Sequence, residues 1–392
     1  MKAKLLSQLA ALATLVFTGD SQAAQYLFTD LGTLSGGSRS YAYGINASGQ
    51  VVGSSNLTIA SGPDSGPSYA TLWNGTTAIA LGTLPSGNGS YAYGINDSGQ
   101  VVGTTFRLGG GTATLWNGTT VIELTTLPGG SASNANGINA NGEVVGGSGS
   151  YATLWSGSTI TSLGMLPNGY YSSAYAINNS GQIVGTTFLE SSTDPILSLY
   201  NPRHATLWNG TTAIDLGTLP GGRYSFAADI NNSGQIVGSS NLTNALGPDS
   251  GPFHATLWTG TAIVDLGTLP GGRNSSASGI NANGLIVGSS DFNYTASLFS
   301  NESHATLWSG SAVIDLNSFL PDIYKNAGWA LRNASNINDS GQIVGDAYNS
   351  RTQTFRAYLL TPVSIPEPAT YSMVGLGVCL LGAVARRRKQ IC

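Results

Sequence analysis

One short phrase recurs seven times and constrains the fold more than any other feature of the chain. The phrase is Ile-Asn-x-x-Gly-x-x-Val-Gly, and successive copies of its Asn are 50, 43, 39, 53, 50 and 57 residues apart. Its Asn residues are Asn46, Asn96, Asn139, Asn178, Asn231, Asn281 and Asn338. A second phrase, Ala-Thr-Leu-Trp, accompanies six copies, and Ala357–Leu360 is its degenerate seventh. Self-similarity at a period of this size indicates a repeat architecture.

Each repeat contains four short segments that read as β-strands. The Trp segment ends in a two-residue turn with Gly, such as Asn74-Gly75, and such a turn between apolar runs is a strong hairpin signal. The third segment ends at Ile-Asn, and Asn-x-x-Gly makes a tight turn into the fourth. A repeat is therefore predicted to be a four-stranded antiparallel meander, which is the strand count of a propeller blade.

The two ends of the array indicate a closed ring. Residues 28–32 match the run that follows a Trp segment, as in 214–217, but have no Trp segment before them. Residues 356–360 resemble a Trp segment that has no run after it. Pairing these ends would remove two exposed sheet edges, and the polar capping repeats of an open solenoid are not seen. We therefore predict an all-β, seven-bladed β-propeller over residues 24–362, closed by its N- and C-terminal strands.

Composition argues against several classes of function. Residues 24–363 carry 9 Lys and Arg against 17 Asp and Glu, and the cations form no stripe. Nucleic-acid binding needs clustered cations, so no nucleic-acid partner is expected. Both cysteines, Cys379 and Cys392, lie outside the array, so no disulfide or Cys-based metal site is expected in it. We find no Ser-His-Asp or Gly-rich phosphate motif and expect no cofactor.

The first 23 residues have the pattern of a secretory signal peptide. Lys2 and Lys4 precede an apolar run over residues 5–17, and small residues lead to a cleavage position after Ala23. We predict an N-terminal signal helix, removal by signal peptidase and export of the chain.

The C-terminal residues 363–392 break the repeat pattern. Residues 363–368 form a Pro-containing linker, residues 369–385 lack any charge, and residues 386–392 form a basic end. A stretch of 17 uncharged residues is at the lower limit for a transmembrane helix, and the following cations favour the cytoplasmic side. The pattern predicts a transient anchor that leaves the propeller outside the cytoplasmic membrane.

Two parts of the chain resemble known families. Pro366-Glu367-Pro368, an apolar span and Arg386-Arg387-Arg388 resemble the PEP-CTERM sorting signal of Gram-negative bacteria. That resemblance implies recognition by a membrane-embedded exosortase, processing near Pro366-Glu367-Pro368, and release to the cell surface or extracellular matrix. The repeat resembles the bacterial HAF extracellular repeat, with Thr where that family has an aromatic residue, as in His204-Ala205-Thr206. It implies an extracellular location and no defined molecular activity.

Several candidate binding residues fall on or beside long connections between the fourth segment and the next Trp segment. Four copies are long, at 54–69, 186–204, 239–254 and 289–304, and we expect them to crowd one face of the ring. Aromatic residues outside the repeat pattern could stack on sugars, and Asp229 replaces the Gly of Gly-Ile-Asn. The candidate binding residues are Tyr200, Phe253, Phe292, Tyr294, Phe299 and Asp229. The other off-pattern aromatics are Tyr170, Tyr171 and Trp329.

Other repeated residues are interpreted structurally. The seven Asn residues suit turns, and the six Trp residues suit packing between blades. His204, His254 and His304 share one repeat position, and they could approach a metal only if that position lined the axis. Packing or hydrogen bonding beside the Trp segment is the favoured interpretation, and we expect no metal site.

The sequence leaves three functions open. The first is a non-enzymatic cell-surface or matrix protein that binds exopolysaccharide or a matrix protein through its long loops. The second is a secreted carbohydrate-active enzyme with its site at the central channel, which would need two carboxyls about 5 to 10 Å apart. The third is a structural component without a ligand. No carboxyl pair can be assigned among the blade-specific acids Glu143, Glu190, Asp194, Asp229, Asp291 and Asp322.

Overall fold

The structure is a computed structural model that describes residues 25–57, 66–190, 201–243, 251–292 and 303–363. Within it, residues 26–362 form one compact unit. The predicted signal helix at 1–23 and the predicted membrane helix at 369–385 lie outside the described residues.

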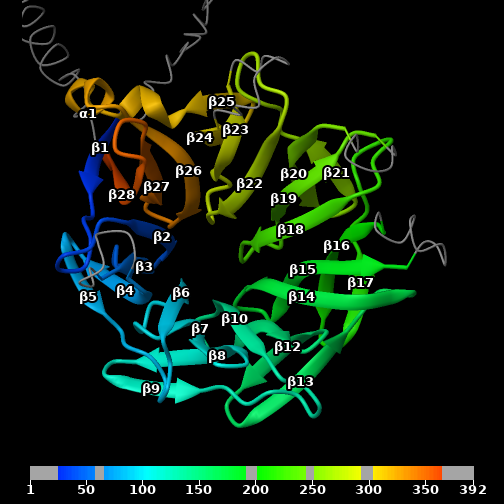
Figure 1. Ribbon diagram of the computed structural model, residues 1–392. Coiled ribbons are helices and arrows are strands. Elements are labelled where there is room, and N and C mark those ends of the chain that lie inside the picture. Colours follow the sequence, from blue (N-terminus) through cyan, green and yellow to red (C-terminus); the bar gives the residue numbers. More distant parts are fainter. Residues whose placement is uncertain (1–24, 58–65, 191–200, 244–250, 293–302, 364–392) are drawn as a thin grey trace, which may run out of the picture. The chain divides into compact units, whose positions relative to one another are not determined.

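The described chain forms seven sheets of four antiparallel strands arranged in a ring (Figure 1). Blade 1 is β2–β5, blade 2 is β6–β9, blade 3 is β10–β13, blade 4 is β14–β17, blade 5 is β18–β21, blade 6 is β22–β25, and blade 7 is β26–β28 with β1. The all-β seven-bladed propeller predicted from the repeats is confirmed.

In blades 1 to 6 the strands run outward from the axis in chain order, and in blade 7 the order outward is β26, β27, β28 and then β1 (Figure 1). The innermost strands are β2 (Ser40–Ile45), β6 (Gly89–Ile95), β10 (Ser133–Ile138), β14 (Gly169–Ile177), β18 (Ser225–Ile230), β22 (Ser275–Ile280) and β26 (Trp329–Ile337). The second strands are β3 (Val51–Asn56), β7 (Val101–Arg107), β11 (Val144–Ser148), β15 (Gln182–Leu189), β19 (Ile236–Asn241), β23 (Ile286–Asp291) and β27 (Ile343–Asn349).

The third strands carry the Trp phrase, and the fourth strands form the rim. The third strands are β4 (Ser68–Asn74), β8 (Gly110–Asn117), β12 (Tyr151–Ser156), β16 (Arg203–Asn209), β20 (Phe253–Thr259), β24 (Ser303–Ser309) and β28 (Thr354–Val363). The fourth strands are β5 (Thr77–Ala80), β9 (Thr120–Glu123), β13 (Thr159–Gly164), β17 (Thr212–Asp215), β21 (Ala262–Asp265), β25 (Ala312–Asp315) and β1 (Gln25–Asp30). A 3-10 turn, η3 (Leu316–Phe319), and a short helix, α1 (Asp322–Asn326), connect blade 6 to blade 7.

Blades and sequence repeats are out of phase by half a unit. A blade begins at the Ile-Asn strand, continues through the Val-Gly strand and ends with the Trp strand and the run of the following repeat. Each sequence repeat therefore contributes two strands to one blade and two to the next, which ties neighbouring blades together through the chain.

The ring closes where the sequence predicted. Strand β1, from the N-terminal part, is the outer strand of blade 7 and lies beside β28. The amide of Leu31 donates to the carbonyl of Ala357 at 3.0 Å, and the amide of Ala357 donates to Ser40 Oγ at 3.0 Å. Pairing the two ends of the array leaves no gap between the first and last blades.

The Trp residues fill the space between blades. Trp73 packs with residues of blade 7 such as Val344 and Ala357, and Trp116 packs with Val52 and Ala70 of blade 1. The six repeat Trp side chains are at most 3% exposed. Burying a side chain of this size is a large part of what holds each pair of blades together.

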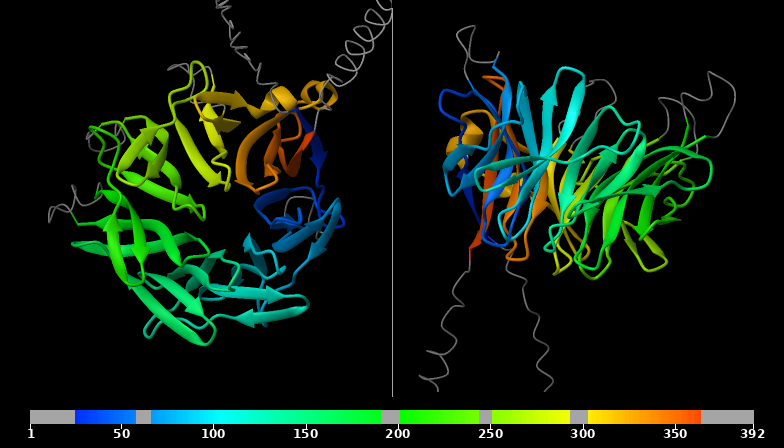
Figure 2. Two further views of the ribbon diagram at one scale, coloured as in Figure 1. Left: turned by 180° about the vertical axis from the view of Figure 1, so that it is seen from behind. Right: turned by 90° about the horizontal axis from the view of Figure 1, so that it is seen from below.

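The two ends of the ring carry different connections between strands; the right panel of Figure 2 views the ring from the side, with one end at the top and the other at the bottom. At one end, the Asn-x-x-Gly turns join first to second strands; we call this the belt end. Pro362 lies there too, because its ring is 3.4 Å from the position of a Cβ on Gly341. At the other end, which we call the loop end, second strands connect to third strands, and all four long connections leave from it.

Candidate functional site

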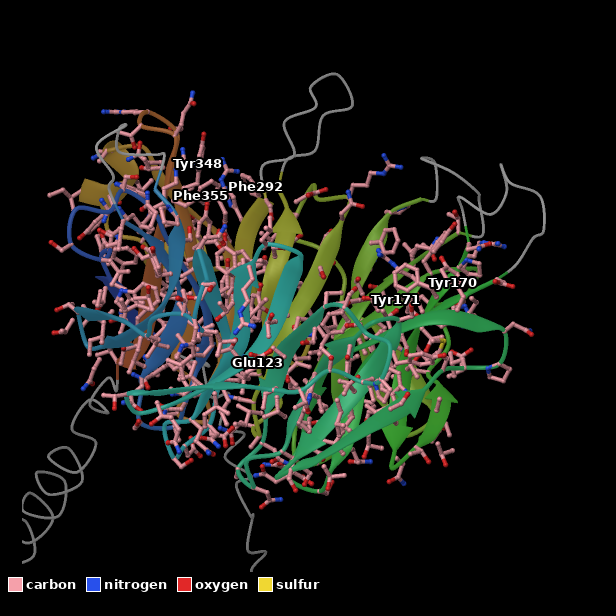
Figure 3. The ribbon with its side chains drawn as sticks, turned by 60° about the horizontal axis from the view of Figure 1, so that its bottom comes forward. Glu123, Tyr170, Tyr171, Phe292, Tyr348 and Phe355 are labelled. Atoms are coloured by element: carbon pink, nitrogen blue, oxygen red, sulfur yellow. The ribbon has the colours of Figure 1, made fainter. Side chains whose placement is uncertain are left out.

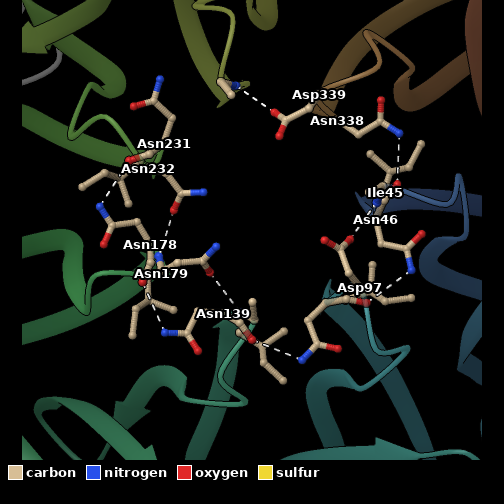
Figure 4. Close-up of a pocket in the computed structure, with 18 of the residues that line it drawn as sticks. Ile45, Asn46, Asp97, Asn139, Asn178, Asn179, Asn231, Asn232, Asn338 and Asp339 are labelled. Atoms are coloured by element: carbon tan, nitrogen blue, oxygen red, sulfur yellow. Dashed lines mark hydrogen bonds between the residues drawn. The ribbon is translucent and has the colours of Figure 1, made fainter.

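Seven Asn side chains form a continuous hydrogen-bonded circle at the belt end, which we call the Asn belt. Figure 4 shows part of this circle, including Asn46, Asn139 and Asn338. Each Asn Nδ2 donates to the backbone carbonyl of the corresponding Asn in the next blade. The bonds run from Asn46 to Asn96 (3.2 Å), to Asn139 (3.1 Å), to Asn178 (3.2 Å), to Asn231 (3.2 Å), to Asn281 (3.1 Å), to Asn338 (3.1 Å) and back to Asn46 (3.0 Å). The last bond joins residues 292 apart in the sequence and completes the circle.

The same Asn side chains hold their own turns. Asn46 Oδ1 accepts from the amide of Gln50 at 2.9 Å and from Ser48 Oγ at 2.8 Å. Asn46 Nδ2 also donates to Gln50 Oε1 at 2.9 Å. The side-chain polar groups are thus committed to the fold, which supports the structural interpretation of this Asn and leaves little capacity for a ligand.

The mouth at the belt end is polar but small, with a volume of about 210 Å³. Beyond the belt it is lined by Asp97, Asn179, Asn232 and Asp339. These side chains also bridge blades: Asp97 Oδ1 accepts from the amide of Ala47 at 2.8 Å, and Asp339 Oδ1 accepts from that of Ala282 at 2.8 Å. Their acceptor role in the ring accounts for their presence.

A collar of Ile residues, each directly before a belt Asn, separates this mouth from a second cavity. Ile45, Ile95, Ile138 and Ile177 line both cavities. The second cavity, which we call the chamber, lies toward the loop end and has a volume of about 400 Å³. The mouth and the chamber therefore adjoin along the channel, with the apolar collar between them.

The chamber has an aromatic half and an open half. Tyr43, Tyr93 and Tyr175 project from the innermost strands of blades 1, 2 and 4, and Asn136 takes the same position in blade 3. Blades 5, 6 and 7 have small residues there, Ala228, Ser278 and Ser335. The ring thus presents a concave tyrosine wall opposite a wall of small side chains.

The tyrosines support one another and remain neutral. The rings of Tyr43 and Tyr93 are 5.6 Å apart, those of Tyr41 and Tyr43 lie 6.5 Å apart and nearly parallel, and Tyr91 stacks beside Tyr93 at 6.3 Å. Burial raises the pKa of Tyr43, Tyr93 and Tyr175. Their hydroxyls therefore stay protonated at physiological pH and can both donate and accept hydrogen bonds.

Among the described residues that line the chamber, Asp229 is the one with a carboxyl group. Its Oδ1 accepts from the amide of Ile230 at 2.8 Å, and its Oδ2 accepts from that of Ile280 in the next blade at 3.0 Å. Burial raises the pKa of Asp229 to about 6, and the two amide donors limit that rise. The residue that the sequence singled out for replacing Gly thus lies in the channel wall.

A second carboxyl of raised pKa lies outside the chamber lining. Burial raises the pKa of Asp346 to about 6, with Asn333 as the partner that limits the rise. Asp346 belongs to β27 and stands opposite Asn333 in β26. Its charge also contributes to the raised pKa of Tyr41 and Tyr43, after burial, so it lies near the aromatic half of the channel.

Two of the other candidate binding residues, Phe253 and Phe292, are described, and they do not line the chamber. Phe292 stacks on the imidazole of His304 at 4.8 Å, so one face of its ring is occupied. Phe253, at the start of β20, lies 6.4 Å from the ring of Tyr224. Tyr200, Tyr294 and Phe299 lie outside the described residues. The described members of the predicted set are therefore not brought together at one site.

The remaining off-pattern aromatics pack at the loop end or in the core. Tyr170 and Tyr171 lie together in Figure 3, and both contact Phe188. Tyr348 and Phe355, which are labelled in the same figure, lie 4.9 Å apart. Trp329 packs against the core of blade 7.

The three His residues do not face the axis. His204, His254 and His304 lie on third strands, and each Nδ1 bonds an Asp on the fourth strand of the same blade. The pairs are His204–Asp215 (2.7 Å), His254–Asp265 (2.8 Å) and His304–Asp315 (2.7 Å). In the part of the chain that the structure describes, no three His, Cys, Asp or Glu residues are grouped as metal ligands. A shared metal site is inconsistent with three pairs in separate blades.

Comparison with known proteins supports the tail and the fold. Residues 364–389 match the PEP-CTERM protein-sorting motif, which marks an exported protein. No curated protein matches the chain significantly. The predicted resemblance of the repeats to HAF proteins stays a prediction. Within the described residues, no helix has the length and apolarity needed to cross a membrane.

Among solved structures, the extracellular domain of a candidate one-component system from B. thetaiotaomicron is similar in fold, with a TM-score of 0.50 and 10% identity. The match covers 85% of this chain and 39% of that one. An acylaminoacyl peptidase from Pyrococcus horikoshii gives a TM-score of 0.37 at 12% identity, over 83% of this chain and 46% of that one. The chain thus spans less than half the length of each of these two structures.

The sequence also held a signal that was missed. Tyr41, Tyr43, Tyr91 and Tyr93 sit inside the repeat, in Ser-Tyr-Ala-Tyr-Gly-Ile-Asn, and were not selected because they look like part of the pattern. Their positions vary between copies, however, whereas the flanking Ser, Ala and Ile hardly do. In this strand, every second position varies between repeats while the positions between them stay nearly constant. That pattern could have identified the varying side chains as the ones that face the channel.

Proposed function

We propose that this protein is an exported, non-enzymatic β-propeller that binds a neutral extracellular glycan in the chamber of its channel. The observation that carries the proposal is the wall of Tyr43, Tyr93 and Tyr175, combined with Asn136 and Asp229, in a cavity of about 400 Å³. Ligand sites of that size typically combine apolar or aromatic surfaces with a few polar groups that fix orientation.

The chemistry of the wall suits sugars. Aromatic rings offer flat apolar faces for the C–H side of a pyranose, while neutral phenols, amides and a carboxylate exchange hydrogen bonds with hydroxyls. The described lining of the chamber contains no Lys or Arg and one carboxyl. An anionic polysaccharide would therefore lose solvation there without gaining a cationic partner.

Placement agrees with an extracellular role. The chamber opens toward the loop end, where the four long connections leave the ring. We retain the proposal that these connections add contacts with exopolysaccharide or a matrix protein, although most of their residues lie outside the described ranges. Exosortase recognition of the tail, transient anchoring by residues 369–385 and release to the surface or matrix complete the proposal.

Binding by the purified full chain tests the proposal. A panel of neutral and anionic oligosaccharides should give binding to at least one neutral glycan. Replacing Tyr43 and Tyr93 together with Ala should weaken that binding about tenfold or more, because loss of an aromatic anchor costs about 1.4 kcal/mol or more. Tyr151→Ala is the matched control, since Tyr151 is 46% exposed and lies outside the chamber. Binding that is unaffected by the double substitution would place the site elsewhere.

A carbohydrate-active enzyme remains the second candidate because Asp229, with its raised pKa of about 6, has the property of a general acid. Glycoside cleavage by two carboxyls would need a partner within about 10 Å. The described chamber lining supplies Asp229 alone, so binding is the favoured function. Release of reducing ends from a bound glycan, abolished by Asp229→Asn, would establish the enzyme instead.

A further inference from the structure

We infer that the site continues from the chamber into a groove over blade 3 and binds an extended linear oligosaccharide rather than a single sugar. This inference rests on the proposed function and names the form of its ligand. A third cavity of about 360 Å³ lies at the loop end and spans blades 2, 3 and 4. We call it the groove.

The groove and the chamber share residues. Tyr93 and Asn136 line both cavities, so a ligand that rests on the face of Tyr93 can extend into either. Phe106 of blade 2 and Tyr171 of blade 4 form the aromatic sides of the groove. Phe106 lies 5.3 Å from Tyr91, and Tyr171 lies 5.4 Å from Phe188. Both side rings are therefore supported by neighbouring aromatic rings.

Small residues in blade 3 make the groove. Blade 3 has Asn134 and Asn136 where blades 1 and 2 have Tyr, and Gly147 where blade 1 has Ser54. The hairpin that β11 forms with β12 is also short, since β11 has five residues, the fewest of the second strands, and β12 begins three residues after β11 ends. Ala132, which precedes the buried Ser133, lines the groove; blades 1 and 5 have Arg39 and Tyr224 at that place. At the loop end, blade 3 therefore forms a depression between the aromatic side chains of blades 2 and 4.

The floor of the groove is polar and fixed. Asn134 Nδ2 donates to Asn136 Oδ1 at 2.7 Å, and Asn136 Nδ2 donates to the carbonyl of Ala174 at 2.7 Å. The lining residues carry no charged side chain. Aromatic sides with an uncharged amide floor repeat the chemistry of the chamber, and two joined cavities of similar chemistry fit successive units of one neutral chain.

Chain length is the variable that tests the inference. Titration calorimetry with the full chain should compare glucan and mannan oligosaccharides of two and six units. The wild type should bind the matching six-unit chain about tenfold more tightly than the two-unit chain. Ala132→Arg puts into the groove a side chain that blade 1 already carries at the same place, so the fold should tolerate it. It should remove most of the gain from length and leave two-unit binding unchanged.

The control and the outcomes separate this inference from the proposed function. Ala80→Arg adds the same side chain at an exposed position on β5, away from both cavities, and should change neither affinity. If the two-unit chain binds but length adds nothing, or Ala132→Arg leaves the gain intact, the groove is not part of the site although the chamber is. If no neutral glycan of either length binds, the proposed function itself fails.

Discussion

Asn338→Asp tests whether the Asn belt holds the ring closed. Asn338 Nδ2 donates to the carbonyl of Asn46 at 3.0 Å and to Gln342 Oε1 at 2.8 Å. Its Oδ1 accepts from the amide of Gln342 at 2.9 Å. Aspartate keeps the size and the acceptor but replaces both donors with an oxygen that faces two other oxygens.

The expected cost follows from these contacts. Each lost hydrogen bond removes about 1 kcal/mol, and a buried carbonyl left without a partner costs about 1 to 3 kcal/mol. We expect the free energy of unfolding to fall by about 3 kcal/mol at pH 7.5. Urea unfolding of the full chain, followed by Trp fluorescence, measures it. A carboxyl held against carbonyls should have a raised pKa, so the deficit should shrink at pH 4.5, where the protonated acid can donate one bond.

Two comparisons make the result decisive. Asn96→Asp breaks the corresponding bond between blades 2 and 3, to Asn139 at 3.1 Å, without touching the closure. Ser340→Ala removes the bond to Asn338 Oδ1 at 2.8 Å and should cost about 1 kcal/mol or less. The reasoning would be refuted if Asn338→Asp lowered the free energy of unfolding less than Ser340→Ala does. It would also be refuted if the loss caused by Asn338→Asp were the same at pH 7.5 and pH 4.5.

Three further predictions concern packing and charge. Trp208→Ala should lower the free energy of unfolding by about 3 to 5 kcal/mol in urea titrations, because Trp208 is 0% exposed between blades and its removal leaves a cavity; Tyr170→Ala, at 44% exposure, should cost far less. Asp346 has a folded-state pKa of about 6, above its ordinary value of 3.8, so it stabilises the fold below about pH 4 and that contribution is lost as pH rises through 6. At pH 7.5, Asp346→Asn should therefore raise the free energy of unfolding above that of the wild type by up to about 3 kcal/mol, the value of a shift of roughly two pKa units. At pH 4 it should give no such gain, and an equal difference between variant and wild type at both pH values would contradict this. Burial acts to raise the pKa of Asp315, but its hydrogen bonds to His304 and Asn317 outweigh that effect, so the pKa is lowered. The stability that the ionised Asp315 contributes should therefore be lost as pH falls below about 4. His304→Ala should make the free energy of unfolding less dependent on pH in this range, as measured by urea unfolding at a series of pH values.

The fold was predictable because the features that create it repeat. Seven copies of one turn, one hairpin and one buried Trp specify the same local structure seven times, and the incomplete first and last copies specify the closure. The phase was not predictable, because four strands per repeat are compatible with cutting the cycle at any strand. The composition of the sheets, such as β2 to β5 in blade 1, shows that each blade begins at the Ile-Asn strand.

The candidate site was harder to predict because it depends on which strand faces the axis. Asp229 was identified from its unusual place in the repeat, and it does line the chamber. Phe292 was selected as an off-pattern aromatic, yet it stacks on His304. Tyr43 and Tyr93 were passed over as pattern residues. Once β2 and β6 are known to be innermost strands, the same sequence assigns these rings to the channel.

The two ends of the ring indicate where function can vary. At the belt end, all seven blades use the same Asn for the same bond, so a change there weakens the ring before it alters any ligand contact. At the loop end, the channel-facing positions differ from blade to blade: Tyr43 in blade 1, Asn136 in blade 3 and Ser278 in blade 6. The strand backbone holds these residues in the same way whichever side chain is present. Substitutions in the innermost strands can therefore change the chemistry of the channel without loss of closure, whereas substitutions in the Asn belt cannot.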